Sequence, residues 1–557
     1  MVRRRSTHRR WTGIAVAAVL GLALVAAACG GGSKSGSGTS NGGGEEAAGK
    51  PVKGGSVTYG LEAENGGGWC LPEGQLAISG IQVARTIYDT LTAPDADAKY
   101  EPFLAKSIEP NADYTQWTIA LRDGIKFHDG SALDATVVKN NIDAYRGKYP
   151  GRSALLFQFV LSNIADVQVV DPMTVKVTTA TPWPAFPAFL HASGRLGIIA
   201  QAQLDDKEHC DTNLIGTGPF KLKEWKPDDH LTTVRNTDYW RKDGDGTQLP
   251  YLDEITYKPV PDGDARVNAL LAGELTAMHA SGPEQIERLR QQKESGKIGL
   301  VESEQYAETT YIMLNAAKPP FDNLNARLAA AYAVDRNTFN KVRNLGITTV
   351  ASGPFAKGSV GYLTDSGFPA YNQAKAKEYA DKYKAETGKD LEITVISTPD
   401  PSTVKSAQFI QEQVEKIGVK VNLKTLEQAQ LISTALGNDW NALSWRNHPG
   451  GAPDLQYVWW HSNMPTNFGK FKDPEIDRLL ETGRAEADPA QQKSIYEDLN
   501  KRFASQAWNI WLNWTIWDVA TASDVHGIYG PDLPSGGKPF PGLATGHPVD
   551  GMWVSKG

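Results

Sequence analysis

Residues 391–426, "LEITVISTPDPSTVKSAQFIQEQVEKIGVKVNLKTL", constrain the fold more than any other stretch of the chain. Two β-branched runs flank a segment with helical spacing of apolar residues that ends near Gly418. The apolar residues of the two expected strands are Ile393, Val395 and Ile396, then Val419, Val421 and Leu423. A strand, a helix and a second strand at this spacing predict two parallel strands joined by a crossover helix.

Other segments predict a mixed α/β chain rather than a purely parallel one. Two strand pairs read as antiparallel hairpins, at residues 167–179 around an Asp-Pro turn and at residues 216–236 around "KPDD". Residues 473–504 predict two helices, the second opened by Asp488 and Pro489. The segment "WNIWLNWTIWDVATAS" predicts one strand that leads into a tail. A length of 557 residues is too great for one core, so we expect two or three domains.

The N-terminus is typical of an export signal. Residues 1–10 contain five arginines, and an uncharged apolar run, residues 11–28, ends in three alanines before Cys29. This layout predicts a signal peptide at 1–28 and lipidation of Cys29, because the junction resembles a bacterial lipobox. The alternative is a transmembrane anchor with an incidental cysteine. Residues 29–53 are rich in Gly and Ser and predict a flexible linker.

The remaining cysteines and the net charge narrow the possible partners. In an exported protein, Cys70 and Cys210 are expected to form one disulfide, with two unpaired buried thiols as the alternative. The formal net charge is −7, and loss of residues 1–28 would remove five arginines and no acid. An acidic mature chain argues against nucleic acid as the main partner. We expect a monomer.

Motifs of common enzyme classes are absent from the sequence. It contains no G-x-S-x-G, H-E-x-x-H, C-x-x-C or Walker phosphate-loop pattern. His448 and His461 are the closest useful histidine pair in the second half, but no third ligand stands at metal spacing. We therefore expect no enzyme, no metal site and no cofactor, and a binding function becomes the leading hypothesis.

One run of motifs resembles a known family. Its residues are Gly216, Thr217, Gly218, Pro219, Phe220, Trp225, Arg235, Asn236, Asp238, Tyr239, Trp240, Pro250, Leu252, Asp253 and Ile255. In this order they resemble the extracytoplasmic solute-binding proteins of the peptide/nickel family of ABC importers. The stretches "WTIALRDGIKFHDGSALDATVV" and "MLNAAKPPFDNLNARLAAAYAVDR" are similar to other parts of that family, so the resemblance extends from about Gly54 to the end.

The resemblance implies a fold, a partition of the chain and a mechanism. The expected fold is α/β, with two lobes of the type II periplasmic-binding-protein kind and an extra subdomain in the first lobe. The expected bounds are 54–312 for lobe 1, about 92–205 for its subdomain, 313–515 for lobe 2 and 516–557 for the return to lobe 1. A solute would be enclosed as the lobes close and then pass to a membrane permease, near which the lipid on Cys29 holds the protein.

The stretch "SWRNHPGGAPDLQYVWW", from Ser444 to Trp460, matches the ligand loop of the family. Trp445 matches the family's tryptophan, either as a flat wall for the ligand or as a core residue. In peptide-binding relatives an aspartate follows soon after and pairs with the peptide ammonium, but here His448 stands about at that position. Asp454 is then the first acid of this loop and one candidate partner for a ligand ammonium.

The other candidate ligand residues are Arg446, Asn447, Glu62, Glu64 and Trp69. Glu62 and Glu64 would reach a ligand ammonium from the opposite lobe, or would lie in a solvated turn. Arg446 would pair with a ligand carboxylate or phosphate, or with a surface acid. Trp69 is a further candidate wall for the ligand, with packing as its other interpretation.

We expect the ligand to be an oligopeptide or a peptide-like solute. The alternatives are an oligosaccharide, haem or a metal chelate in the same fold, or presentation of a ligand to a surface sensor. An anchored secreted hydrolase is a remote alternative, because the chain has no nucleophile motif.

Overall fold

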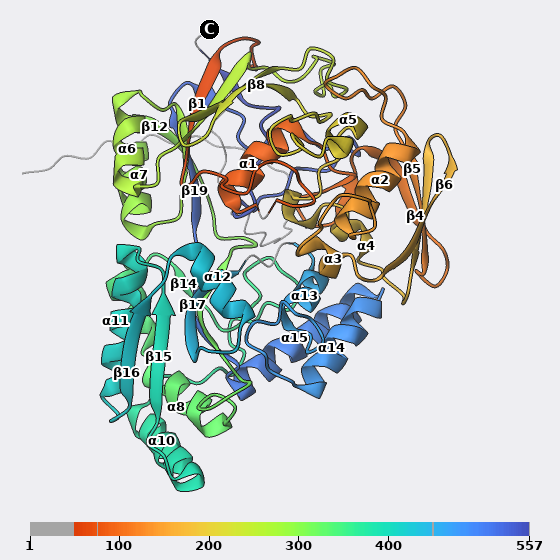
Figure 1. Ribbon diagram of the computed structural model, residues 1–557. Coiled ribbons are helices and arrows are strands. Elements are labelled where there is room, and N and C mark those ends of the chain that lie inside the picture. The colour runs from red at the N-terminus through yellow and green to blue at the C-terminus, as the bar shows by residue number, and fades with distance from the viewer. Residues whose placement is uncertain (1–48, 75, 448–450, 556–557) are drawn as a thin grey trace, which may run out of the picture. The chain divides into compact units, whose positions relative to one another are not determined.

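The computed structural model describes residues 49–74, 76–447 and 451–555. The predicted signal peptide, Cys29 and the linker up to residue 48 lie outside the described residues, as does His448. The described residues form two lobes, each built on its own β-sheet (Figure 1). The expected two-lobed α/β fold is confirmed.

Lobe 1 is built on a mixed sheet of seven strands in the order β12-β19-β11-β1-β10-β9-β8. Its central strand, β1, runs parallel to β10 and β11, and the other pairings are antiparallel. The strands are β1 (Ser56–Leu61), β8 (Phe220–Lys226), β9 (His230–Arg235), β10 (Glu254–Pro259), β11 (Ala277–Ala280), β12 (Ile298–Ser303) and β19 (Trp517–Ala522). The hairpin predicted at residues 216–236 is the β8–β9 pair.

Helices cover this sheet with apolar faces. They are α1 (Ile78–Ile87), α6 (Gly263–Ala272) and α7 (Pro283–Glu294). Leu289 of α7 packs with Met278 and Leu300 of the strands in one buried cluster. Figure 1 shows α6 and α7 together beside β12 and β19.

A subdomain within lobe 1 is built on the antiparallel sheet β4-β5-β7-β6. Its strands are β4 (Ala105–Pro110), β5 (Gln116–Leu121), β6 (Ile164–Asp171) and β7 (Thr174–Thr179), and β6–β7 is the predicted Asp-Pro hairpin. Its helices are α2 (Ala135–Tyr145), α3 (Phe157–Val160), α4 (Phe186–Phe189), the 3-10 turn η1 (Ala192–Gly194) and α5 (Gln201–Asp205). A short pair, β2 (Thr92–Pro94) and β3 (Tyr100–Pro102), precedes it.

Lobe 2 is built on a six-stranded sheet in the order β14-β18-β13-β17-β15-β16. Its strands are β13 (Thr309–Leu314), β14 (Thr349–Val350), β15 (Glu392–Ser397), β16 (Lys420–Thr425), β17 (Ala442–Asn447) and β18 (Asn509–Trp514). β15 and β16 are parallel and are joined by α11 (Pro401–Glu415), as residues 391–426 predict.

The helices of lobe 2 surround this sheet. Besides α11 they are α8 (Leu324–Ala333), α9 (Arg336–Arg343), α10 (Gln373–Thr387), α12 (Gln428–Leu436), η2 (Pro453–Gln456), α13 (Tyr457–Trp460), α14 (Pro474–Ala485) and α15 (Pro489–Gln506). The cap predicted for the second of the paired helices is present, because the Asp488 side chain accepts from the backbone N–H groups of Ala490 and Gln491.

The chain crosses between the lobes twice. It leaves the first sheet after Ser303 and joins the second at Thr309, a few residues before the expected boundary at 312. Thr309 and Thr310 are β-branched and belong to the lobe 2 strand. The chain returns between β18 and β19, which share the segment predicted as one strand. No Gly or Pro marks this break, and both strands are buried, so the apolar sequence pattern continues across it without interruption.

The segment after β18 lies in lobe 1, because β19 pairs with β11 and β12 of the first sheet. After β19 it forms the short pair β20 (Val525–His526) and β21 (Trp553–Val554). No helix within the described ranges is long and apolar enough to cross a membrane.

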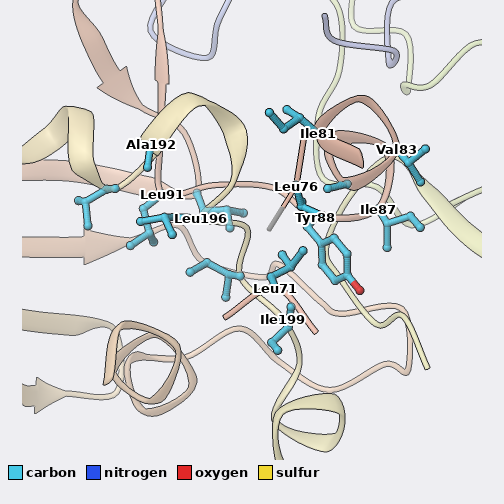
Figure 2. Close-up of a cluster of buried hydrophobic side chains, with 14 of the residues drawn as sticks. Leu71, Leu76, Ile81, Val83, Ile87, Tyr88, Leu91, Ala192, Leu196 and Ile199 are labelled. Carbon is cyan, nitrogen blue, oxygen red and sulfur yellow. The ribbon is translucent and has the colours of Figure 1, made fainter. Parts of the chain in front are cut away.

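The core of lobe 1 is centred on α1. Figure 2 shows Ile81, Val83 and Ile87 of this helix beside side chains from the loop before it and from residues 192–199. The glycine motif at 216–218 belongs to this packing, because the Gly218 N–H donates to the Ile87 carbonyl at 2.9 Å. A Cβ on Gly216 would lie 1.9 Å from that carbonyl oxygen, so only glycine fits there.

The disulfide between Cys70 and Cys210 is present, with the two Cα atoms 5.0 Å apart. It joins the loop before α1 to the segment after α5, across 140 residues of sequence. The side-chain amide of Gln203 supports both ends, because it donates to the carbonyls of Cys210 and Trp69. The bond therefore fixes the loop that carries Trp69 against the rest of lobe 1.

We expect the double change Cys70→Ser and Cys210→Ser to lower the free energy of unfolding by about 2–5 kcal/mol. The bond closes a long loop, and its loss returns conformational entropy to the unfolded chain. Thermal unfolding with and without dithiothreitol measures the effect, with Cys29→Ser as the control. An unchanged midpoint in the double variant would contradict this expectation.

Candidate functional site

The two lobes meet at Arg446, near the end of β17. Its guanidinium forms an ion pair with Glu62 of lobe 1, at 3.7 Å between Nη2 and Oε1. A second ion pair joins Arg446 Nε to Glu308 Oε2 at 3.2 Å. Glu308 lies on the first crossing segment, so one side chain of lobe 2 contacts both lobe 1 and the hinge. About 40% of the Arg446 side chain remains exposed, which leaves part of it accessible to a ligand.

Glu308 is fully buried and is held by both crossing segments. Trp517, just after the return crossing, donates its indole N–H to Glu308 Oε2 at 3.1 Å. The Arg446 guanidinium also lies 5.7 Å from the centre of the Trp517 ring. The negative charge of Glu308 is the largest influence on the pKa of Arg446 and raises it. Arg446 therefore remains charged at this junction.

Glu62 is positioned by a neutral histidine. The backbone N–H of Glu62 donates to His279 Nε2 at 3.0 Å, so this nitrogen has to be unprotonated. Burial lowers the pKa of His279 well below its usual value, which agrees with that role. The neighbouring Ala63 N–H donates to the Ser79 hydroxyl at the start of α1. The residues after β1 are thus fixed where lobe 1 faces Arg446.

The side chains of Glu64 and Trp69 have other partners and do not join the junction at Arg446. The Glu64 carboxylate accepts from the backbone N–H groups of Asn65 and Asp228, so it holds its loop to the β8–β9 turn. Trp69 is buried and packs edge to face on Trp225 at 5.9 Å. Its indole N–H has no hydrogen-bond partner among the described residues. Both side chains line a small pocket with room for about one water molecule.

Trp445 occupies a position between its two predicted roles. It is half-buried at the edge of the lobe 2 core and packs edge to face on Phe468 at 5.5 Å. Asn447 is buried and pairs with Thr309 in the β13–β17 ladder. Trp460 is core and Trp459 is only partly buried, as expected for adjacent aromatic residues.

Asp454 is not free to meet a ligand, contrary to the hypothesis for the first acid of this loop. It is completely buried, accepts the indole N–H of Trp183 at 2.7 Å and forms an ion pair with Arg484 at 3.0 Å. A ligand ammonium would have to displace partners that already satisfy this carboxylate. The sequence hides this arrangement because both partners are distant along the chain.

The structure thus brings Arg446 and Glu62 together and separates Glu64, Trp69 and Asp454 from them. Sequence patterns did not single out Glu308, Trp517 or His279 as parts of this junction. Glu308 had one usable signal, an isolated acid directly before an apolar strand. Within the described ranges, no group of three or more His, Cys, Asp or Glu side chains is arranged to hold a metal ion.

Buried ionisable groups in lobe 1 couple its stability to pH. Burial lowers the pKa of His547 to about 4 and of His191 to about 3, against about 6.5 in an unfolded chain. The unfolded chain then binds more protons below pH 6.5, so full acidification costs up to about 3 kcal/mol for His547 and about 5 kcal/mol for His191. Asp89 acts oppositely: burial raises its pKa to about 6, so the folded chain takes up its proton first.

We expect the thermal unfolding midpoint to fall between pH 7 and pH 5, because the buried neutral histidines outnumber Asp89. His279→Gln should reduce this slope, since glutamine does not titrate and its amide oxygen still accepts from Glu62. His209→Gln, at an exposed position, is the matched control and should keep the wild-type slope. A midpoint that is equal or higher at pH 5 would show that the histidines do not dominate.

Comparisons with known proteins agree with this architecture. The sequence profile of the bacterial extracellular solute-binding proteins, family 5, matches residues 99–469. The chain is similar to the glutathione-binding protein GsiB of Pectobacterium atrosepticum, with 28% identity over 76% of this chain and 82% of that protein.

Two solved structures have the same fold. The Helicobacter pylori binding protein DppA in complex with the peptide STSA matches with a TM-score of 0.77 and 23% identity, covering 91% of this chain and 99% of that one. The Bacillus subtilis oligopeptide-binding protein AppA in complex with a nonapeptide matches with a TM-score of 0.76 and 22% identity, covering 91% and 100%. The profile match spans more than half of the chain, which therefore belongs to the family 5 bacterial extracellular solute-binding proteins.

Proposed function

We propose that this chain is the substrate-binding subunit of an ABC importer and encloses a peptide or peptide-like solute between its lobes. The observation that carries the proposal is the junction at Arg446, where an accessible guanidinium meets carboxylates of the opposite lobe and of the hinge. Closure would place a bound solute in contact with both lobes, so the solute would stabilise the closed form. Such a task requires binding and no catalysis.

The charges at the junction favour a zwitterionic solute. Arg446 and Glu62 are 3.7 Å apart, a long ion pair that leaves room for a better one. A solute carboxylate would bind the Arg446 guanidinium, and a solute ammonium would bind Glu62. Glu308 would stay on the opposite edge of Arg446 and keep it oriented. A short peptide carries both groups.

The relatives support the same class of solute. One is named for glutathione, and two solved neighbours hold a short peptide and a nonapeptide. Trp445, half-buried beside Arg446 on β17, would offer a ring face to the peptide. Asn447 and His448 follow Trp445 in the sequence and are further candidates for contact with the ligand. Glu64 and Trp69 are weaker candidates, because they line a separate pocket. An oligosaccharide, haem or a metal chelate is the alternative ligand class.

The N-terminus would keep the protein near its permease. A lipid on Cys29 and the flexible linker up to residue 53 would hold the folded body at the outer face of the cytoplasmic membrane, as a monomer. Presentation of the loaded form to a surface sensor is the alternative use of the same capture step.

We expect glutathione, Ser-Thr-Ser-Ala or a longer peptide to raise the thermal unfolding midpoint and to bind by isothermal titration calorimetry. Arg446→Gln should weaken that binding by about tenfold to a hundredfold, because hydrogen bonds to charged groups contribute about 1.5–3 kcal/mol. Arg446→Lys should lose part of the binding affinity, since lysine keeps the charge but not the planar guanidinium that binds a carboxylate through two hydrogen bonds.

Arg478→Gln is the control, because Arg478 lies exposed on α14 and pairs with Glu475. Binding of a sugar, haem or a nickel chelate in the same screen, with no response to any peptide, would refute the peptide assignment. Cleavage of a peptide detected by mass spectrometry would refute a purely binding role.

We expect Cys29→Ser to move the protein from the membrane fraction to the soluble fraction of its host. The serine cannot take a thioether-linked lipid, and the Gly/Ser-rich linker has no affinity for membrane. Fractionation and the intact mass of the purified protein measure both consequences. A variant that stays in the membrane fraction would support the alternative of a transmembrane anchor.

A further inference from the structure

The lobes have a second contact, separate from Arg446. Trp183, in the loop between β7 and α4 of the subdomain, donates its indole N–H to Asp454 Oδ2 at 2.7 Å. Asp454 lies in η2 of lobe 2, in the same Ser444–Trp460 stretch as Arg446. Both side chains are completely buried. This hydrogen bond therefore joins the subdomain to lobe 2 with no access for water.

Arg484 of α14 completes this contact from within lobe 2. It forms an ion pair with Asp454 at 3.0 Å, and its guanidinium lies 3.5 Å from the centre of the Tyr457 ring. Two rings of lobe 1 cover the same guanidinium, Trp183 at 5.3 Å and Phe189 at 5.9 Å. Lobe 2 thus supplies the whole ion pair and the nearest ring, and lobe 1 supplies two more rings.

The neighbouring residues of lobe 2 also enter lobe 1. Ala452 and Leu455 pack in the core cluster of lobe 1. The Tyr100 hydroxyl of lobe 1 lies against Gly451, where its oxygen would be 3.2 Å from an added Cβ. The contact is therefore an apolar patch with one charged pair at its centre, and separating the lobes would expose all of it.

The indole N–H of Trp183 helps to offset the cost of burying the ion pair between Asp454 and Arg484. Burial of an ion pair costs desolvation, which its own attraction repays only when the remaining lone pairs find donors. Trp183 is the donor that lobe 1 provides to Asp454. If the lobes separate, water can replace this donor and hydrate the pair, so the hydrogen bond itself contributes only about 0.5–1.5 kcal/mol to closure. Burial of the surrounding apolar patch favours the closed form further, and neither contribution involves a solute.

We infer that Trp183 is a positioning residue for solute capture: its contact with Asp454 and Arg484 is a latch that sets the population of the closed form even when no solute is bound. The inference rests on the proposed function only in that the lobes open and close. The apparent affinity for any solute then rises with the closed fraction that the latch maintains. Trp183 is fully buried and its N–H is already used, so this effect requires no contact with the solute.

The test measures the distance between the lobes in the empty protein. Fluorescent labels are placed on Val170→Cys of the subdomain and Leu436→Cys of lobe 2, both exposed positions, in the full chain carrying Cys29→Ser. Cys70 and Cys210 are bonded to each other and do not take label. Single-molecule energy transfer then reports open and closed populations without any solute.

Trp183→Phe keeps a ring and removes the donor. We expect it to raise the ratio of open to closed molecules about tenfold, which corresponds to about 1.4 kcal/mol. Trp117→Phe is the matched control. Trp117 is a buried tryptophan of the same subdomain whose N–H has no partner among the described residues, and it should leave the populations unchanged.

Phe189→Leu removes part of the cover over Arg484, keeps the hydrogen bond and should shift the populations in the same direction. If Trp183→Phe does not fold, the Phe189→Leu variant still tests the latch. Identical distance distributions in wild type, Trp183→Phe and Phe189→Leu would overturn the latch, and so would an empty wild-type protein with no closed population. Because no solute enters the measurement, its outcome is independent of whether the protein captures peptides.

Discussion

The structure depends on the way Glu308 ties its two crossing segments together. Its backbone carbonyl accepts from the Thr515 N–H at 3.0 Å, and its carboxylate accepts from the Trp517 indole at 3.1 Å. The strands on either side of it belong to different sheets, so this one residue fixes where each sheet begins. A buried carboxylate needs such partners. Arg446 adds a positive charge from lobe 2, and the hinge is thereby linked electrostatically to the cleft.

Beyond this hinge, the two lobes touch at two separate contacts along one loop. The stretch from Ser444 to Trp460 meets lobe 1 at Arg446 and again at Asp454, with opposite electrostatic characters. The Arg446 contact is partly exposed and its ion pair with Glu62 is long, so a solute can replace it at small cost. The Asp454 contact is dry, and its groups are already satisfied within the protein. Exchange with a solute is therefore favoured at the first contact and disfavoured at the second.

Local patterns predicted the parts of the fold whose partners are close in sequence. The parallel unit at residues 391–426, both hairpins and the Asp488 cap depend on spacing within a few tens of residues. The disulfide was accessible because only Cys70 and Cys210 follow the predicted lipidation site at Cys29. Glu308, Trp183 and Asp454 behave differently, because Asp454 and Trp183 are 271 residues apart and no local pattern encodes their meeting. The break between β18 and β19 was hidden for another reason: two fully buried strands in succession give one continuous apolar run.

Asp454 shows why an acid in a ligand loop is not by itself a ligand residue. A carboxylate in a ligand loop can bind a solute only if the protein leaves it short of partners. Here Arg484 of lobe 2 and Trp183 of the opposite lobe already bind the carboxylate. It therefore stabilises the contact between the lobes and is not available to a solute. Glu62 has the reverse situation, since its backbone is fixed by His279 while its side chain meets Arg446 only at 3.7 Å. Recognition of a solute ammonium in this chain is therefore expected from lobe 1, on the opposite side of the cleft from the family's aspartate.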